Sequence, residues 1–224
     1  MKNKLAKYRA EREKNDQKIS DLRKRNAQLD ELVKAPEALQ TTVLHLIERE
    51  IENAQNGLPS GIIAKMNSMC DVSIMEALCQ AGRAGVKVQL IIRGICSLIP
   101  GIPGESDNIE VYSLVGRNLE HARAFRFENG GNAEVYLSSA DWMPRNLYRR
   151  VELMFPVKDE ACKQAVENVL RLQLCDNQQL RVRLPDGSYS LLEDEAAAPV
   201  DAQDVLLKDV MAVFEGTYGK GEEA

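Results

Sequence analysis

The sequence predicts an α/β fold, because apolar runs of strand length alternate with amphipathic helical segments. The runs near 60–66 and 86–92 are almost continuously apolar, and a helical pattern near 72–84 lies between them. Strands that are apolar on both faces belong to sheets that are covered on both sides. A strand, helix, strand unit is therefore expected at the centre of the fold.

The elements around this unit follow from the same periodicities. Further strands are expected at about 109–113, 123–128, 134–137 and 151–156. Helices are expected at about 36–56, where Gly57 would end the helix, at 160–174 and at 202–214. A hairpin is expected around the turn sequence Pro185-Asp186-Gly187.

Composition indicates an ordinary globular protein with one substantial core, since 44% of the 224 residues are hydrophobic. No apolar run approaches the roughly 18 residues of a membrane span. The N-terminus also lacks the apolar segment of a signal peptide, so a cytoplasmic location is expected. The five cysteines have no C-x-x-C spacing and are expected to be reduced core thiols: Cys70, Cys79, Cys96, Cys162 and Cys175.

The first 34 residues are highly charged and predict a helix with a coiled-coil-like apolar stripe. Its apolar positions are Leu5, Tyr8, Ile19, Leu22, Leu29 and Val33. Polar residues also fall on this stripe, so weak self-association and a solvated single helix are both open. The expected organisation is an amphipathic helix over 1–35, one α/β domain over 36–215 and a disordered tail over 216–224.

The segment 119–142 carries the most informative motif. His121, Arg123 and Glu128 follow the pattern H-x-(K/R)-x4-(D/E), and Ser139 and Asp141 come after them. If this segment is a strand, His121, Arg123 and Phe125 share one face because side chains alternate. An imidazole and a guanidinium on one face can both address a phosphate, which predicts phosphoryl chemistry.

Other polar residues stand at the ends of the expected strands. Lys65 and Asn67 end the first apolar strand, and Arg93 ends the second. Functional groups in such sheets gather at strand ends, so these residues are expected to converge with Ser139 and Asp141 on one pocket. The loop 97–108 is either a rim of that pocket or a plain crossover between strands.

Between Val88 and Arg150 every basic residue is an arginine. The set is Arg93, Arg117, Arg123, Arg126, Arg145, Arg149 and Arg150. The planar guanidinium suits bidentate contact with phosphate oxygens, although each of these side chains could instead make a surface ion pair.

Four long segments resemble the C-terminal catalytic domain of bacterial polyphosphate kinase. They are "GLPSGIIAKMNSMCD", "GVKVQLIIRGICSLIPGIPGESDNIEV", "LVGRNLEHARAFRFENGG" and "VYLSSADWMPRNLYRRVELMFPV". The resemblance runs from about Ala35 to Val213 and implies a phospholipase D-like mixed sheet flanked by helices. It also implies ATP, ADP and inorganic polyphosphate as substrates, with reversible transfer of the terminal phosphate of ATP.

In that family, the phosphorylated histidine and part of the nucleotide and magnesium site lie in a preceding domain, which nothing here matches. Mg²⁺ is therefore expected for the full family enzyme, with its ligands mostly in that domain and none assigned here. The remaining kinase domains are expected partners, together with self-association through 1–34. No nucleic acid partner is expected.

The resemblance also implies roles for individual residues. Arg93 and His121 match residues that bind nucleotide phosphates, and His121 matches a catalytic residue that donates or accepts a proton. Further phosphate-positioning or pocket-framing residues are Arg123, Ser139, Asp141, Arg145, Arg150, Lys65 and Asn67. The chain departs from the family at Asn118, where an aromatic is usual, and at Tyr148, where an acidic residue is usual.

Three functions are open on this basis. The favoured one is a kinase domain that holds phosphates but is inactive as an isolated chain. The second is a single-motif phospholipase D-like phosphodiesterase, in which two copies of His121 face each other in a homodimer. The third is a non-catalytic protein, either an interaction module or the remnant of a degraded reading frame.

Overall fold

The computed structural model describes residues 33–34, 38–192 and 198–209. The chain divides into two units, 1–33 and 34–224, and the second contains nearly all of the described residues. The tail over 216–224, the end of the last expected helix and most of the amphipathic helix expected over 1–35 lie outside them. Val33–Lys34 form strand β1, so the prediction that the first helix extends over these two residues is wrong. None of the described helices is both long and apolar enough to cross a membrane.

The domain is built on one mixed sheet with the strand order β1-β7-β6-β5-β2-β3-β4-β8-β9. Strands β2, β3 and β4 run parallel, whereas β5, β6, β7, β8 and β9 each pair antiparallel with their neighbours. The strand bounds are β1 Val33–Lys34, β2 Gly61–Met66, β3 Lys87–Ile92, β4 Ile109–Leu114, β5 Ala124–Phe127, β6 Glu134–Ser138, β7 Leu153–Pro156, β8 Leu180–Arg183 and β9 Tyr189–Leu191.

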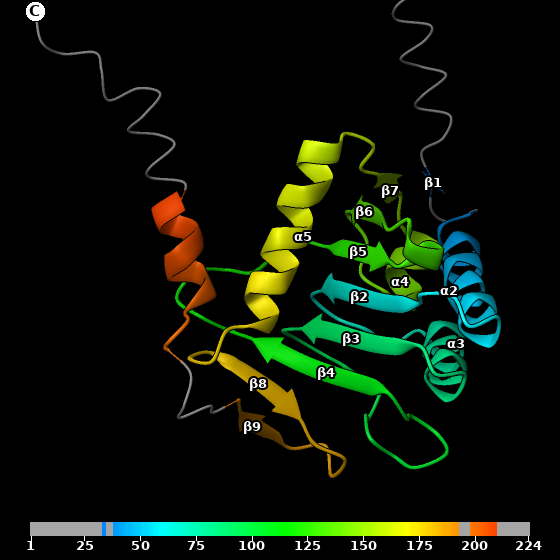
Figure 1. Cartoon of the computed structure of the whole chain (residues 1–224), viewed down its shortest axis with the longest axis horizontal. Coiled ribbons are helices and arrows are strands. Elements are labelled where there is room, and N and C mark those ends of the chain that lie inside the picture. Colours follow the sequence, from blue (N-terminus) through cyan, green and yellow to red (C-terminus); the bar gives the residue numbers. More distant parts are fainter. Residues whose placement is uncertain (1–32, 35–37, 193–197, 210–224) are drawn as a thin grey trace, which may run out of the picture. The chain divides into compact units, whose positions relative to one another are not determined.

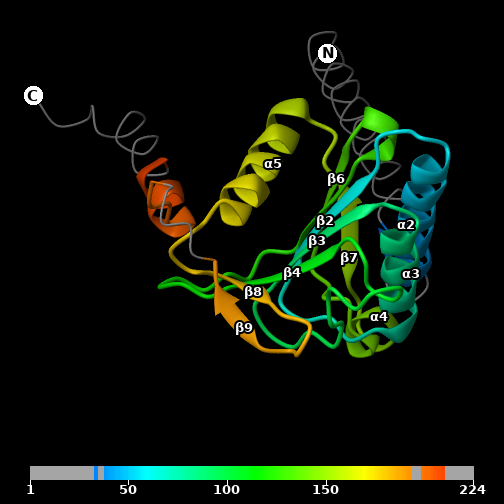
Figure 2. The same ribbon diagram turned by 60° about the horizontal axis from the view of Figure 1, so that its bottom comes forward.

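Helices cover both faces of this sheet, as the two views in Figures 1 and 2 show. Helices α2 (Leu39–Gln55) and α3 (Val72–Arg83) lie on one face, and α5 (Glu160–Leu174) lies on the other. A short helix, α4 (Pro144–Arg149), follows β6, and a C-terminal helix covers 202–209. The predicted α/β fold with a mixed sheet flanked by helices is confirmed.

Alternating side chains of the central strands fill a core on each side of the sheet. On the α5 side, Ile91, Leu114, Ala124, Leu170 and Leu180 form one buried cluster. On the opposite side the largest fully buried residues include Ile62, Leu90, Phe125 and Trp142. The rings of Phe125 and Trp142 lie 4.8 Å apart between centroids and connect β5 to the segment after β6.

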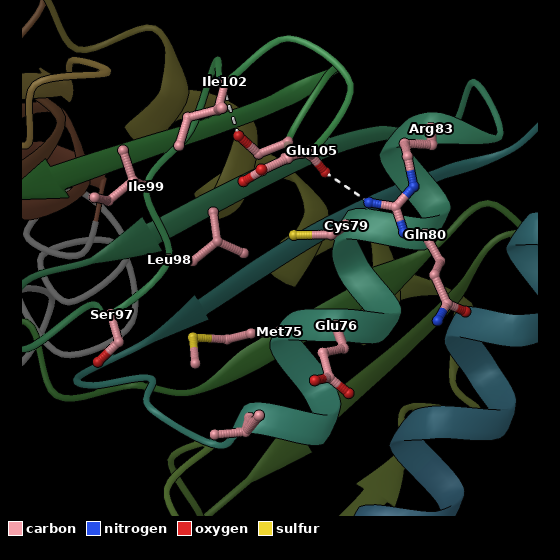
Figure 3. A pocket seen from close by; sticks show the side chains of 12 residues that line it. Met75, Glu76, Cys79, Gln80, Arg83, Ser97, Leu98, Ile99, Ile102 and Glu105 are labelled. Carbon is pink, nitrogen blue, oxygen red and sulfur yellow. Dashed lines mark hydrogen bonds between the residues drawn. The ribbon is translucent and has the colours of Figure 1, made fainter.

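The loop 97–108 packs against α3 and is a crossover between the parallel strands β3 and β4. Arg83 donates to the carbonyl of Glu105 at 3.0 Å, and Asn108 donates to the carbonyl of Gly82 at 2.9 Å. Met75 and Cys79 of α3 and Leu98 of the loop line a groove of about 610 Å³ between the two segments (Figure 3). No residue with an expected site role lines this groove.

Several details differ from the sequence-based expectations. Strand β5 begins only at Ala124, so the prediction that His121 and Arg123 lie on this strand is wrong. Glu50 is fully buried on α2, and its carboxylate accepts bonds from the backbone N–H groups of Gly61 and Asn129. A polar helix residue is therefore buried because it satisfies two backbone donors at the ends of β2 and β5.

The cysteines are free, as expected, but they are not all in the core. Cys96 is buried and Cys70 and Cys79 are partly buried, whereas Cys162 and Cys175 are exposed. Cys162 lies in the first turn of α5, and Cys175 directly follows the last residue of this helix. The prediction of five core thiols is wrong for these two.

Candidate phosphate site

Five polar residues from four separate segments form one hydrogen-bonded chain, which we call the Asp141 network: Asn67, Arg93, His121, Arg123 and Asp141. Strands β2 and β3 are parallel, so Asn67 and Arg93, which follow them, lie at the same edge. Strand β5 is antiparallel to β2 and β6, so its start and the end of β6 lie at that edge as well. The expected convergence of strand ends is therefore observed for Asn67, Arg93 and Asp141, but Ser139 and Lys65 bond elsewhere.

Asp141 is the centre of the network. Arg123 donates to both of its carboxylate oxygens, from Nε at 3.1 Å and from Nη2 at 3.3 Å. Asn67 donates to Asp141 Oδ1 from its backbone N–H at 2.8 Å and from its side-chain amide at 3.0 Å. Four donors thus hold one carboxylate that is only 11% exposed.

These contacts determine the charge of Asp141. Burial by itself would raise its pKa, but the hydrogen bonds from Arg123 and Asn67 and the charge of Arg123 outweigh burial and leave the pKa lowered. The carboxylate is therefore ionised at neutral pH. It serves to orient Arg123 and Asn67, because its oxygens are already engaged.

The two ends of the network have free polar groups. Arg93 donates from Nε to Asn67 Oδ1 at 2.7 Å, and within the described residues its two terminal nitrogens have no partner. At the other end, Arg123 Nη1 lies 3.2 Å from His121 Nδ1 and donates to the His121 carbonyl at 3.1 Å. Arginine can only donate, so Nδ1 accepts and the proton of a neutral His121 imidazole lies on Nε2.

His121 is exposed, so this Nε2–H group is accessible from solvent. Glu128, the acidic member of the sequence motif, is not part of the network. It lies beyond the opposite end of β5 and accepts from Arg126 at 2.6 Å. The arrangement can therefore bind an anion through Arg93 and exchange a proton with it through His121.

Ser139 belongs to a second polar group, the Glu152 cluster, which consists of Ser139, Asn146 and Glu152. The Ser139 hydroxyl donates to one oxygen of Glu152, and Asn146 donates to the other at 2.9 Å. Ser139 Oγ also accepts from the backbone N–H of Leu153 at 3.1 Å. The serine is thus fully occupied in joining β6 to β7 and is not joined to His121.

Arg150 and Arg145 are exposed residues at or next to α4. Arg150 lies 4.0 Å from Glu152 and its side chain is 48% exposed. An ion pair of that length and exposure contributes little to stability. Both arginines therefore keep most of their charge available to an anion in solvent.

Lys65 is placed behind the His121 loop, the segment 115–123 that links β4 to β5. Its Nζ lies 3.0 Å from Glu120, and its side chain is only 5% exposed. Burial lowers the pKa of Lys65, although the charge and hydrogen bond of Glu120 oppose this. Lys65 is thus engaged inside the protein.

Sequence patterns did not identify the residues that hold this loop. Glu120 accepts from Gln173 of α5 and from Gln203 of the C-terminal helix, both at 2.9 Å. Burial alone would raise the pKa of Glu120, but these hydrogen bonds and Lys65 outweigh it and lower the pKa. Only the position of Glu120 next to the motif histidine could have drawn attention to it.

Comparison with known proteins gives the family. Residues 32–203 match the family described as polyphosphate kinase C-terminal domain 2. The chain belongs to this family. It is 46% identical over 184 residues to a polyphosphate kinase of Rhodopirellula baltica, and 49% identical over 158 residues to one of Thermosynechococcus vestitus. The matched regions are 82% and 70% of this chain but 22% of each relative.

A crystal structure of polyphosphate kinase from Porphyromonas gingivalis has the same architecture, with a TM-score of 0.79 and 38% identity. It is matched by 83% of this chain, which covers 28% of that protein. A phospholipase D family member, Nuc from Salmonella typhimurium, gives a TM-score of 0.43 at 17% identity over 61% of the chain. The chain therefore spans about a quarter of the length of the polyphosphate kinases that it resembles.

The structure shows the contacts of Tyr148 and Asn118, the two positions at which the sequence is expected to depart from the family. The Tyr148 hydroxyl donates at 3.2 Å to Asp71, whose carboxylate also accepts from Ile74 N at the start of α3. A tyrosine can donate to this buried carboxylate, whereas an ionised acidic residue would repel it. The backbone of Asn118 is held by Gln203, so the loop does not depend on an aromatic side chain there.

The Asp141 network does not fit a magnesium site. Within the described residues no group of three or more His, Cys, Asp or Glu side chains could hold a metal ion. Asp141 is the one carboxylate of the network, and its oxygens already accept from Arg123 and Asn67. The expectation that Mg²⁺ binds mostly elsewhere in the family enzyme stays a prediction.

Proposed function

We propose that this chain is a polyphosphate kinase domain that binds the phosphates of ATP and inorganic polyphosphate during reversible transfer of the terminal phosphate of ATP. The observation that carries the proposal is the Asp141 network. It presents the free guanidinium nitrogens of Arg93 and the Nε2–H of His121 at one edge of the sheet. Membership of the family supports the choice of substrates.

In this proposal Arg93 binds phosphate oxygens through its two terminal nitrogens, because a planar guanidinium matches two oxygens of one phosphate. Arg123 is engaged by Asp141 and therefore keeps His121 in place. His121 donates its Nε2 proton to a phosphate oxygen or the leaving oxygen, and accepts it back in the reverse reaction. Arg145 and Arg150 attract further phosphates of a long chain.

The covalent step is assigned to a histidine outside this chain. Only two histidines are present, His45 and His121. His45 is exposed on α2 and takes no part in the Asp141 network. Incubation with labelled ATP and polyphosphate should therefore give no ladder of lengthened chains above background. A ladder would contradict this assignment of the covalent step.

Binding is tested by titration calorimetry with ATP and with polyphosphate at two salt concentrations. Affinity should fall as salt rises, because exposed charges on Arg and phosphate are screened. Arg93→Ala should weaken binding about tenfold, as expected for loss of a charge-assisted contact of roughly 1.4 kcal/mol.

The matched control is Arg171→Ala, which removes the same charge from the exposed surface of α5. Its affinity should equal that of the parent chain. If Arg93→Ala binds polyphosphate as tightly as Arg171→Ala, the proposed site is wrong. Hydrolysis of a phosphodiester by the parent chain, with His121 required, would instead favour the phosphodiesterase alternative.

A further inference from the structure

The His121 loop is held in place although it forms no helix or strand. It runs from Val115 to Arg123, and six of its residues, including Leu119 at 75% exposure, are largely in solvent. Few apolar contacts can fix such a segment, so polar contacts from neighbouring elements must do so. Those contacts come mainly from one side chain.

That side chain is Gln203, at the start of the C-terminal helix. Its Oε1 accepts from the backbone N–H of Asn118 at 2.8 Å, and its Nε2 donates to the Asn118 carbonyl at 2.9 Å. The side-chain amide of Gln203 thus makes the same two hydrogen bonds with Asn118 that the backbone of a neighbouring β-strand would make. The same Nε2 also donates to Glu120 at 2.9 Å, and Gln203 is only 6% exposed.

The loop sequence is adapted to this side chain. A Cβ atom at Gly116 would lie 2.6 Å from Gln203 Oε1, so only glycine lets the loop approach the amide this closely. Glu120, once held by Gln203, completes its contacts with Lys65 and Gln173. The residue directly before His121 is thus fixed from three elements.

Gln203 is itself firmly placed. The backbone N–H of Ala202 donates at 2.8 Å to Asp176, which is fully buried and also caps the turn after α5 by accepting from Gln178 and Gln179. Asp201 accepts from the N–H groups of Gln203 and Asp204. The C-terminal helix is therefore attached to the end of α5 through residues that the structure describes.

We propose that Gln203 is the positioning residue of His121, acting through the backbone of Asn118 and the carboxylate of Glu120. Arg123 orients the imidazole from the Asp141 side, and Gln203 holds the preceding backbone from the other side. Lys65 then serves to neutralise Glu120 beneath the loop. The importance of His121 rests on the proposed function, but its orientation can be measured without any ligand.

The test is a correlation spectrum of the imidazole nitrogens of the full chain labelled with ¹⁵N-histidine. Only His121 and His45 contribute, and His45 on α2 is an internal reference. The parent chain should show His121 in one tautomer, with the proton on Nε2. Gln203→Ala should make His121 average between tautomers and weaken polyphosphate binding about tenfold, the effect of losing one to two hydrogen bonds.

Two further variants make the outcome decisive. Gly116→Ala displaces the Gln203 amide without removing it and should give the same averaging, which covers the case that Gln203→Ala does not fold. Asp204→Ala removes only the surface ion pair with Arg117 and should leave the His121 signal unchanged. A parent-like His121 signal in folded Gln203→Ala, or in Gly116→Ala if Gln203→Ala is unfolded, overturns the inference.

Failure of the proposed function can be distinguished from failure of the positioning role of Gln203. If the parent chain does not bind polyphosphate, the function is wrong, while the tautomer spectra still decide the role of Gln203. If the parent chain binds polyphosphate, and folded Gln203→Ala has the same affinity and the same His121 signal, only the positioning role is wrong.

Discussion

The Asp141 network and the Glu152 cluster start from the same four residues of sequence, Ser138 to Asp141, yet they differ in what they leave free. In the Glu152 cluster, Ser139 and Asn146 donate to the two oxygens of Glu152, so the polar groups are hydrogen-bonded to one another. In the Asp141 network, the carboxylate is satisfied but Arg93 and His121 keep polar atoms for solvent. A polar cluster is a candidate binding site when some of its hydrogen-bond donors are free. It has a structural role when all of its donors are engaged within the protein.

The largest expected difference between the two regions is in the response to loss of the carboxylate. Asp141→Ala should lower the free energy of unfolding by about 3 kcal/mol, because Arg123 loses its partner in a nearly buried ion pair. It should also abolish measurable polyphosphate binding, because Asn67 and Arg123 no longer orient Arg93 and His121. Urea unfolding and calorimetry measure the two effects.

Glu152→Ala is the matched change in the other region. It should cost about 2 kcal/mol of unfolding free energy, because Asn146 keeps a buried donor without a partner. Polyphosphate affinity should stay within about twofold of the parent, the scatter expected for a change without direct contact. Loss of binding equal to that of Asp141→Ala would show that the distinction between the regions is wrong.

Acid should destabilise the protein partly through Asp141 and Glu120, because both carboxylates are held in their ionised form by hydrogen bonds and charges. The pKa values of Asp141 and Glu120 are lowered from 3.8 and 4.5, so their stabilising effect is complete above those values and is lost as pH falls through the lowered ones. Between pH 5 and pH 3 the parent chain should lose up to about 1 kcal/mol more unfolding free energy than Asp141→Asn, which has no carboxyl group to protonate there. Equal pH dependence in the two proteins would contradict the assigned charge of Asp141.

The smallest effect is expected at the exposed arginines. Arg150→Ala should change unfolding free energy by less than about 0.5 kcal/mol, because its contact with Glu152 is long and exposed. It should weaken binding of long polyphosphate about twofold and leave ATP binding unchanged, since only a long chain reaches it. A larger loss for ATP than for polyphosphate would place Arg150 in the nucleotide site.

The sequence predicted what depends on regular burial and missed what depends on single long-range contacts. The apolar runs that became β2 and β3 identified the sheet, and the polar residues at their ends, Asn67 and Arg93, followed from its geometry. Gln203 could not be found in this way, because its contact with Asn118 spans 85 residues and leaves no periodic signal.

Two local errors have a similar origin. The alternating pattern of β5 continues back to His121. The backbone of Asn118, however, bonds to the side chain of Gln203, and the His121 carbonyl accepts from the side chain of Arg123, so this segment forms a loop. Helix α4 has only six residues, which is too short for a helical period to be recognised. In both places tertiary contacts decide the conformation.

The most direct test is backbone amide NMR of the full chain during titration with inorganic polyphosphate. The account predicts that the amides of Asn67, Gly94, Ala122 and Asp141 shift together, whereas those of Asn146 and Glu152 stay in place. Shifts at Asn146 and Glu152 without shifts at Gly94 and Ala122 would show that the phosphate site does not lie at the Asp141 network.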